Sequence, residues 1–147
     1  MKSEELSVDL RDTMVSSRTS TLRPQRRYQR RGFRTTLRRS SQERHCTLLG
    51  GNLASIQSEA EYDFIRGVVL KAAGRHQESW VGGYDAAKEG VWLWSDGSQF
   101  EFKRWGKGEP NNRWFGEGCM EINLKGRDFV NDAKCSQEQP FICAKDL

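Results

Sequence analysis

The stretch GKGEPNNRWFGEGC, residues 106–119, decides the fold and raises the question of function. It places two glutamates, two asparagines, a proline and four glycines between a tryptophan and a disulfide-type cysteine. A loop of this length inside a compact domain is usually either functional or disordered. Which of the two applies decides what the protein does.

Oxygen-bearing side chains gather in this loop and shortly after it. Five of them could act together as ligands: Glu109, Asn111, Glu117, Asn131 and Asp132. Three are anionic, and carboxylate and amide oxygens are the ligands of a hard cation such as Ca²⁺. A cation would also explain why the acidic groups cluster, because like charges held close together repel. The alternative is a solvated polar loop, and composition alone does not decide between the two.

The charge of the 147-residue chain is unevenly distributed. Residues 1–44 carry a net charge of +7 and residues 45–147 a net charge of −3, which together give the overall +4. Residues 1–40 are rich in Arg and Ser and have no sustained apolar period, so we expect a basic, disordered N-terminal arm. Residues 41–147 then form one folded domain. The arm either binds anionic partners or is not the native N-terminus of this domain, and we favour the second interpretation.

The four cysteines, Cys46, Cys119, Cys135 and Cys143, are even in number and lack the close pairs of zinc sites. Disulfides are therefore favoured over free thiols, which indicates an oxidising compartment. His45 and His76 occupy helix-end or turn contexts, and we expect them to be surface or packing residues. No apolar run has the length of a membrane span, and no signal peptide is visible after Met1.

Two helices are expected before the strands begin. Residues 40–49 favour a short helix that ends at the glycines 50–51. Ser58 and Glu61 form a capping box that opens a second helix, and Gly74 ends it. In that helix one apolar face is expected to carry Tyr62, Ile65 and Val69.

The second half of the domain favours β structure. Strands are expected at residues 79–83, 91–102, 119–124 and 140–145, and Asp96-Gly97 indicates a hairpin inside the second range. Two helices followed by several short strands is an α+β order.

Six short motifs in this order resemble the C-type lectin domain: WVGG, VWLWSDGS, EPN, EGC, ND before a cysteine, and FICAK. The resemblance covers residues 41–147 and is greatest to small, soluble, single-domain members. It implies a C-type lectin-like fold in which two helices pack on short antiparallel strands, with a long calcium-binding loop. It also implies the disulfides Cys46–Cys143 and Cys119–Cys135.

The resemblance assigns roles to the oxygen ligands. One Ca²⁺ would be held by Glu109, Asn111, Glu117, Asn131 and Asp132, and the first four would also contact sugar hydroxyls. Pro110 is expected to follow a cis peptide bond. The order Glu-Pro-Asn implies glycans with equatorial 3- and 4-hydroxyls, such as mannose, N-acetylglucosamine and glucose, and also fucose, whereas Gln-Pro-Asp goes with galactose. Binding at one site would be weak, and a homo-oligomer would supply avidity.

An auxiliary calcium site is implied at Asp85, Glu89 and Asn112, which would share Glu117. Asn112 stands where aspartate is commoner, which removes one charge from this site. For Asp85 and Glu89 we favour ordinary loop acids over calcium ligands. For Trp114 and Phe115 we expect packing of the loop onto the body rather than stacking on a sugar. Core positions are expected for four further indoles: Trp80, Trp92, Trp94 and Trp105.

Two departures from the family pattern have structural consequences. Val130 replaces the tryptophan that usually precedes Asn-Asp, so a looser core is expected beneath the calcium loop. The family's opening strand is also not recognisable before residue 41. If no other segment replaces it, the last strand, 140–145, has an open edge, which favours aggregation or dimer pairing.

The sequence thus predicts a secreted, calcium-dependent lectin of innate immunity without catalytic activity. No phosphate-binding glycine loop, GxSxG or HExxH motif indicates an enzyme. Two alternatives remain. One is a type II antifreeze protein or another binder of non-sugar ligands on the same fold. The other is anion or nucleic-acid binding through the basic arm, and we consider nucleic acid the less favoured partner.

Overall fold

The computed structural model of the chain describes residues 6–8, 13–17, 26–31, 39–113 and 115–146. In this part of the chain the helices are α1 (Arg39–Leu48), α2 (Glu59–Ala73) and the short 3-10 helix η1 (Leu124–Gly126). The strands are β1 (Leu6–Val8), β2 (Thr13–Ser17), β3 (Arg26–Arg31), β4 (Asn52–Leu53), β5 (Ser79–Tyr84), β6 (Leu93–Trp94), β7 (Cys119–Ile122), β8 (Asn131–Ala133) and β9 (Phe141–Asp146). The predicted α+β class is confirmed.

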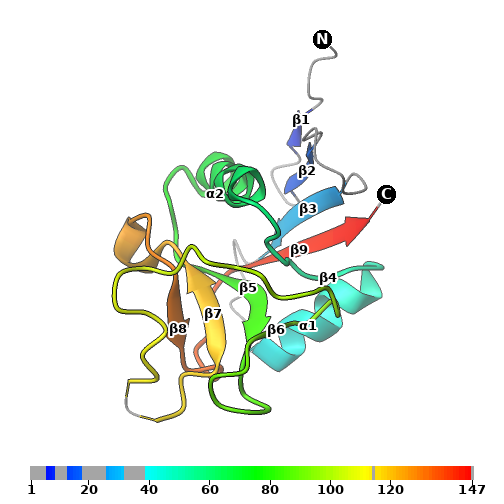
Figure 1. The fold of residues 1–147 in the computed structure, drawn as a ribbon. Coiled ribbons are helices and arrows are strands. Elements are labelled where there is room, and N and C mark those ends of the chain that lie inside the picture. Colours follow the sequence, from blue (N-terminus) through cyan, green and yellow to red (C-terminus); the bar gives the residue numbers. More distant parts are fainter. Residues whose placement is uncertain (1–5, 9–12, 18–25, 32–38, 114, 147) are drawn as a thin grey trace.

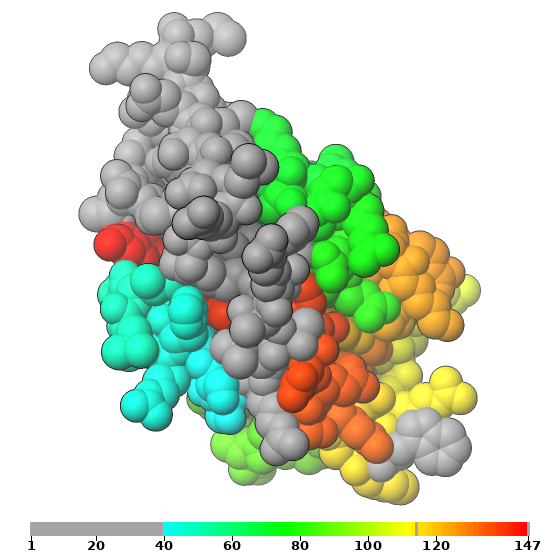
Figure 2. All heavy atoms as spheres, turned by 180° about the vertical axis from the view of Figure 1, so that it is seen from behind, coloured from blue at the N-terminus to red at the C-terminus, as the bar shows by residue number. Residues whose placement is uncertain are grey.

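All of these strands belong to one mixed sheet. Its order is β1-β2-β3-β9-β5-β7-β8, with β4 paired to β9 and β6 paired to β5. Strands β5 and β9 run parallel, whereas the other pairs are antiparallel. Helix α1 lies beside β4 and β9, and α2 lies near β2 and β3 (Figure 1). The long loop before β7 protrudes at one end of the molecule in both overall views (Figures 1 and 2).

The N-terminal segment corrects one expectation. Strand β3 pairs with β9 along its whole length, from Arg26 opposite Asp146 to Arg31 opposite Phe141. Strand β3 thus replaces the opening strand, so β9 does not have the open edge, and the described parts of residues 1–40 include three strands rather than only a disordered arm. The physical reason is that ladder hydrogen bonds use backbone groups, so an Arg-rich segment can pair without an apolar period. The domain boundary at residue 40 stays a prediction.

Helix α2 begins and ends as expected. The Ser58 hydroxyl accepts a hydrogen bond from the backbone N–H of Glu61 over 3.1 Å, and the Glu61 carboxylate accepts one from the N–H of Gln57. Gly74 ends the helix at φ 72°, a left-handed conformation that glycine adopts without steric cost. Tyr62, Ile65 and Val69 are buried in the main core, which confirms the predicted apolar face.

The prediction of a hairpin at Asp96-Gly97 is wrong, although the turn itself is present. The N–H of Gly97 donates to the carbonyl of Trp94 over 3.0 Å, but β6 pairs with β5 and residues 98–102 form no strand. Aromatic packing accounts for the difference. Phe100 and Phe102 place their ring centroids 4.6 and 6.1 Å from Trp94, and packing there replaces a second strand.

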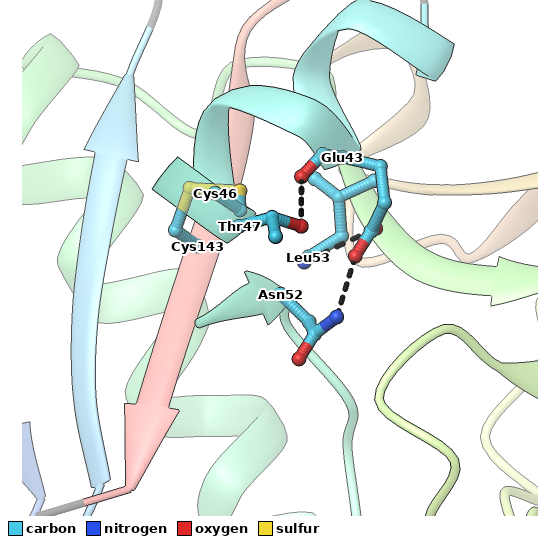
Figure 3. The surroundings of a disulfide bond; sticks show 6 residues. All are labelled: Glu43, Cys46, Thr47, Asn52, Leu53 and Cys143. Atoms are coloured by element: carbon cyan, nitrogen blue, oxygen red, sulfur yellow. Dashed lines mark hydrogen bonds between the residues drawn. A yellow bond between two sulfur atoms is a disulfide. The ribbon is translucent and has the colours of Figure 1, made fainter. Parts of the chain in front are cut away.

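Two disulfides fasten the domain, and both pairings expected from the resemblance are confirmed. Cys46–Cys143 joins α1 to β9, and Cys119–Cys135 joins β7 to the chain that follows β8. Figure 3 shows that Glu43 of α1 reaches across to β4 beside the first disulfide. Its carboxylate accepts hydrogen bonds from the side-chain amide of Asn52 over 2.8 Å and from the N–H of Leu53 over 3.3 Å. Helix α1 is thus attached to the sheet by covalent and polar contacts together.

Candidate functional site

The long loop is anchored to the sheet at its base. The N–H of Gly106 donates to the carbonyl of Val130 over 2.9 Å, immediately before β8. A Cβ atom at Gly106 would lie 2.5 Å from the ring of Phe129, so this close approach requires glycine. Val130 is fully buried in the main core. The base of the loop is therefore held by the backbone of Val130 and lies against the ring of Phe129, and the looser core expected from Val130 stays a prediction.

The Glu-Pro-Asn segment has the arrangement that the resemblance implied. The bond between Glu109 and Pro110 is cis. The side-chain amide of Asn111 donates to Oε1 of Glu109 over 2.9 Å. The first two predicted ligands therefore lie side by side at the surface of the loop.

Asp132 connects this segment to β8. Its Oδ1 accepts from the N–H of Asn111 over 3.1 Å, and its Oδ2 accepts from the N–H of Asn112 over 2.6 Å. Asp132 is 1% exposed, so these hydrogen bonds are well shielded from water. Residues about twenty positions apart in the sequence are thereby brought into one site.

The carboxylates of the site disfavour one another's charge. Oε2 of Glu109 is buried and finds no hydrogen-bond donor in the described part of the chain. The pKa of Glu109 is raised to about 7. The largest cause is burial, followed by a hydrogen bond that a proton on Glu109 would make to Asp132 and by the charges of Asp132 and Glu117. Burial followed by the charge of Asp132 also raises the pKa of Glu117. The charges of Lys134 and Arg113 oppose that rise without cancelling it, so the carboxylates of the site still repel one another.

The donor set fits a hard cation, although the carboxylates are not yet converged. Within the described residues, no three His, Cys, Asp or Glu side chains are gathered as closely as a metal centre requires. The unpartnered Oε2 of Glu109 and the mutual repulsion of the acids are the features that Ca²⁺ coordination would relieve. The backbone of the loop is already attached to Asp132, which places two of the predicted ligands near β8.

Asn131, the fourth predicted ligand, lies one residue before Asp132 but makes a different contact. Its side-chain amide donates to Oε1 of Glu121 over 2.8 Å. Oε2 of Glu121 accepts a second hydrogen bond, from the amide of Gln139 over 2.8 Å. Sequence analysis missed Glu121 and Gln139. The available signal was a glutamate inside the otherwise apolar strand sequence CMEI.

Two residues of the implied auxiliary site help to build loops, although Oδ1 of Asp85 is buried without a hydrogen-bond partner in the described part of the chain. Asp85 is buried, and its Oδ2 accepts from the N–H of Gly90 over 2.9 Å. Asn112 has φ 45°, and its Oδ1 accepts from the N–H groups of Gly116 and Glu117 over 2.9 and 3.1 Å. Glu89 is exposed on the same surface turn as Asp85. The Asn112 oxygen stabilises its own turn, so an auxiliary ion would have to compete with those two hydrogen bonds.

The remaining singled-out side chains divide between core and surface. Phe115 is 93% exposed, so its expected packing onto the body is wrong, and Trp114 lies outside the described residues. Trp80 and Trp94 are buried, while Trp92 and Trp105 are partly buried against the main core. His45 lies edge-on to Phe141, and His76 is half-buried at the end of the turn before β5.

The sequence pattern of the Lectin C-type domain family matches residues 37–145, so the chain belongs to this family. The galactose-specific lectin nattectin from Thalassophryne nattereri is 46% identical over 108 residues, which cover 74% of this chain and 67% of nattectin. Ladderlectin from Oncorhynchus mykiss is 46% identical over 98 residues, which cover 67% of this chain and 52% of ladderlectin. The chain thus spans about half to two thirds of these relatives.

Solved structures agree with this assignment. The C-type carbohydrate-recognition domain of cow CD23, determined in the presence of a GlcNAc2Man3 oligosaccharide, is 30% identical with a TM-score of 0.70, and the match covers 83% of this chain and 88% of that one. Herring type II antifreeze protein is 25% identical with a TM-score of 0.72, and the match covers 87% and 95%.

The family is one of non-catalytic carbohydrate-binding modules, which confirms the expectation that the protein is not an enzyme. In the described residues no helix is long and apolar enough to cross a membrane.

Proposed function

We propose that this domain is a calcium-dependent lectin that binds mannose-type sugars through Glu109, Asn111, Glu117, Asn131 and Asp132. The observation that carries the proposal is the pair of hydrogen bonds that the backbone N–H groups of Asn111 and Asn112 donate to the carboxylate of Asp132. These contacts attach the Glu-Pro-Asn segment to β8. They bring Glu109 and Asn111 to the same end of the molecule as Asn131 and Asp132. The buried, unpartnered Oε2 of Glu109 supports a cation there.

A bound Ca²⁺ would supply coordination positions for two neighbouring sugar hydroxyls. The chain's own residues would complete the hydrogen bonds of those hydroxyls. Glu109 and Glu117 can accept the hydroxyl protons, and the Asn111 amide can donate to a hydroxyl oxygen. Asn111 uses one amide N–H for Glu109, so the second N–H remains for a sugar.

The order Glu-Pro-Asn supports the mannose class, with equatorial 3- and 4-hydroxyls. Nattectin is named as galactose-specific, so galactose is the competing ligand that a test has to include. One exposed monosaccharide buries little surface, and we propose that a homo-oligomer supplies avidity. The two disulfides and the relatives support secretion into an oxidising environment.

The test is retention on immobilised mannose and galactose, with calcium and then with chelator. We expect retention on mannose, release by chelator and little effect of salt. The double change Glu109→Gln with Asn111→Asp should shift preference toward galactose, whereas Glu101→Gln, an exposed acid outside the loop, should change nothing. Retention that survives chelation, or an unchanged preference in the double variant, would contradict the assigned roles.

Ice binding is the second candidate, because two type II antifreeze proteins share this fold with TM-scores of 0.72 and 0.71. It predicts thermal hysteresis in dilute solution. It also predicts that the protein is not retained on a sugar column in a form that chelator releases. Binding of anions through the Arg-rich segment is the third candidate. It predicts affinity that falls steeply with salt and ignores chelator.

A further inference from the structure

Glu121 is a buried carboxylate that the proposed sugar site does not use. It is 2% exposed in the middle of β7, where it lies opposite Asn131 of β8 and Trp80 of β5. Burial raises the pKa of Glu121, and the amides of Asn131 and Gln139 oppose that rise. A buried ionisable group is costly unless its hydrogen bonds are satisfied, so its position calls for a physical reason.

Both oxygens of Glu121 accept hydrogen bonds from neutral carboxamides. Oε1 accepts from Nδ2 of Asn131, and Oε2 accepts from Nε2 of Gln139, each over 2.8 Å. The backbone carbonyl of Gln139 in turn accepts a hydrogen bond from the side-chain amide of Gln42 over 2.8 Å. Gln42 is a fully buried residue of α1. A polar network therefore runs from α1 beneath the sheet to the strand that carries the predicted ligands.

The chemistry of Glu121 selects one orientation of the Asn131 side chain. A carboxamide can be flipped so that either its oxygen or its nitrogen faces a given neighbour, and an ionised carboxylate can only accept. The nitrogen of Asn131 must therefore face Glu121. Its oxygen then lies on the opposite side of the amide and is left available as an acceptor.

We propose that Glu121 is a positioning residue for the metal site: it holds the Asn131 amide by its nitrogen and so leaves Oδ1 of Asn131 free to coordinate a cation. This inference rests on the proposed calcium site. The asparagine orientation is fixed before metal binding, so less ordering entropy is lost when the ion binds. Outer partners that orient metal ligands commonly change metal affinity by about 10- to 100-fold when they are replaced.

The test compares Glu121→Gln with Glu78→Gln as a matched control. Glutamine keeps the size of Glu121 but provides one acceptor and one donor, so it no longer dictates which way the Asn131 amide faces. Glu78 is a nearby carboxylate whose charge acts on Glu121 but which bonds the N–H of Lys125 instead. Calcium affinity is measured by calorimetry without any sugar, and stability by thermal unfolding in chelator.

We expect Glu121→Gln to weaken calcium affinity about 10-fold, and Glu78→Gln to change it less than 2-fold. The double variant Glu121→Gln with Gln139→Glu should recover most of the loss. In it Asn131 can donate to the oxygen of residue 121, whose own amide can donate to the new carboxylate. If Glu121 had only a structural role, Glu121→Gln would lower thermal stability, but calcium affinity would not be lost in the single variant and recovered in the double variant.

Each outcome has a distinct meaning. Wild-type protein that binds no calcium contradicts the proposed function itself. Wild-type protein that binds calcium while Glu121→Gln binds it equally well, or a double variant that recovers nothing, overturns the role of Glu121 alone. Should Glu121→Gln fail to fold, NMR of the calcium-free wild type decides. An Asn131 side-chain amide that is protected from exchange supports the proposal, and one that exchanges like an exposed asparagine refutes it.

Discussion

Two regions of this molecule are stabilised in opposite ways. Around α1, β4 and β9, a disulfide, a buried apolar cluster and the Glu43 contacts hold the chain together. In the loop of residues 106–118, backbone N–H groups donate to the carboxylate of Asp132 and so hold several acidic and amide side chains near β8. One oxygen of Glu109 is buried there without a hydrogen-bond partner in the described part of the chain. The first region is held by covalent, apolar and polar contacts among its own residues. We propose that a bound cation completes the second region, so its stability should depend on calcium.

The largest expected effect in this comparison concerns the disulfides. Replacing Cys46 and Cys143 by alanine opens a connection across 97 residues, and replacing Cys119 and Cys135 opens one across 16. In the chain-entropy model the first pair should contribute about 5 kcal/mol and the second about 3 kcal/mol to the free energy of unfolding. Denaturant titration of the two double variants measures how much free energy of unfolding each one loses. A larger loss from the shorter connection would contradict this expectation.

A smaller effect is expected at Asp128, close to the start of the loop. Asp128 accepts from the Tyr62 hydroxyl over 2.6 Å and from Arg104 over 2.8 Å, so it links α2 to the chain that enters the loop. We expect Asp128→Asn to lower the free energy of unfolding by about 1 kcal/mol, since the group is partly exposed. Equilibrium unfolding of wild type and variant at neutral pH measures this difference.

The same contact predicts a pH dependence. Burial alone raises the pKa of Asp128, but the Tyr62 hydrogen bond and the charges of Arg66 and Arg104 outweigh it and hold that pKa below its usual value. Its stabilising contribution is therefore complete above the unfolded-state pKa of about 3.9 and is lost as pH falls through the lower folded-state pKa. The Asp128→Asn variant should lack this component. An identical acid dependence in both proteins would show that Asp128 contributes nothing.

The smallest effect is expected at the tip of the loop. Phe115 is 93% exposed and belongs to neither apolar core cluster. Phe115→Ala should therefore change the free energy of unfolding by less than about 0.5 kcal/mol. Phe102→Ala, at a partly buried ring packed against Trp94, should cost about 3 kcal/mol. Comparable losses in the two variants would mean that the loop packs against the body after all.

Much of the scaffold could be predicted from the sequence, because its signals are local. Ser58, Glu61 and Gly74 mark the ends of α2 by hydrogen-bonding and backbone chemistry that operates within a few residues. The disulfide pairing and the cis bond before Pro110 followed from the resemblance to a family. The pairing could not have been deduced from four cysteines alone, since these allow three connectivities.

The features that sequence analysis missed depend on distant partners. Pairing of β3 with β9 uses backbone groups that carry no residue-specific signal. Phe100 and Phe102 do not form the second strand of the expected hairpin, because their packing against Trp94 competes with strand pairing. The contact between Glu121 and Asn131 could be recognised only when the opposite neighbour of Glu121 in β8 was known.

Calorimetric titration of calcium into the oxidised protein, combined with thermal unfolding, tests the central claim most directly. The account predicts heat from about one ion per chain. It also predicts a gain in the free energy of unfolding of about 2.7 kcal/mol when free calcium is 100 times the dissociation constant. Absence of heat at millimolar calcium, with the same unfolding midpoint in calcium and in chelator, would contradict it.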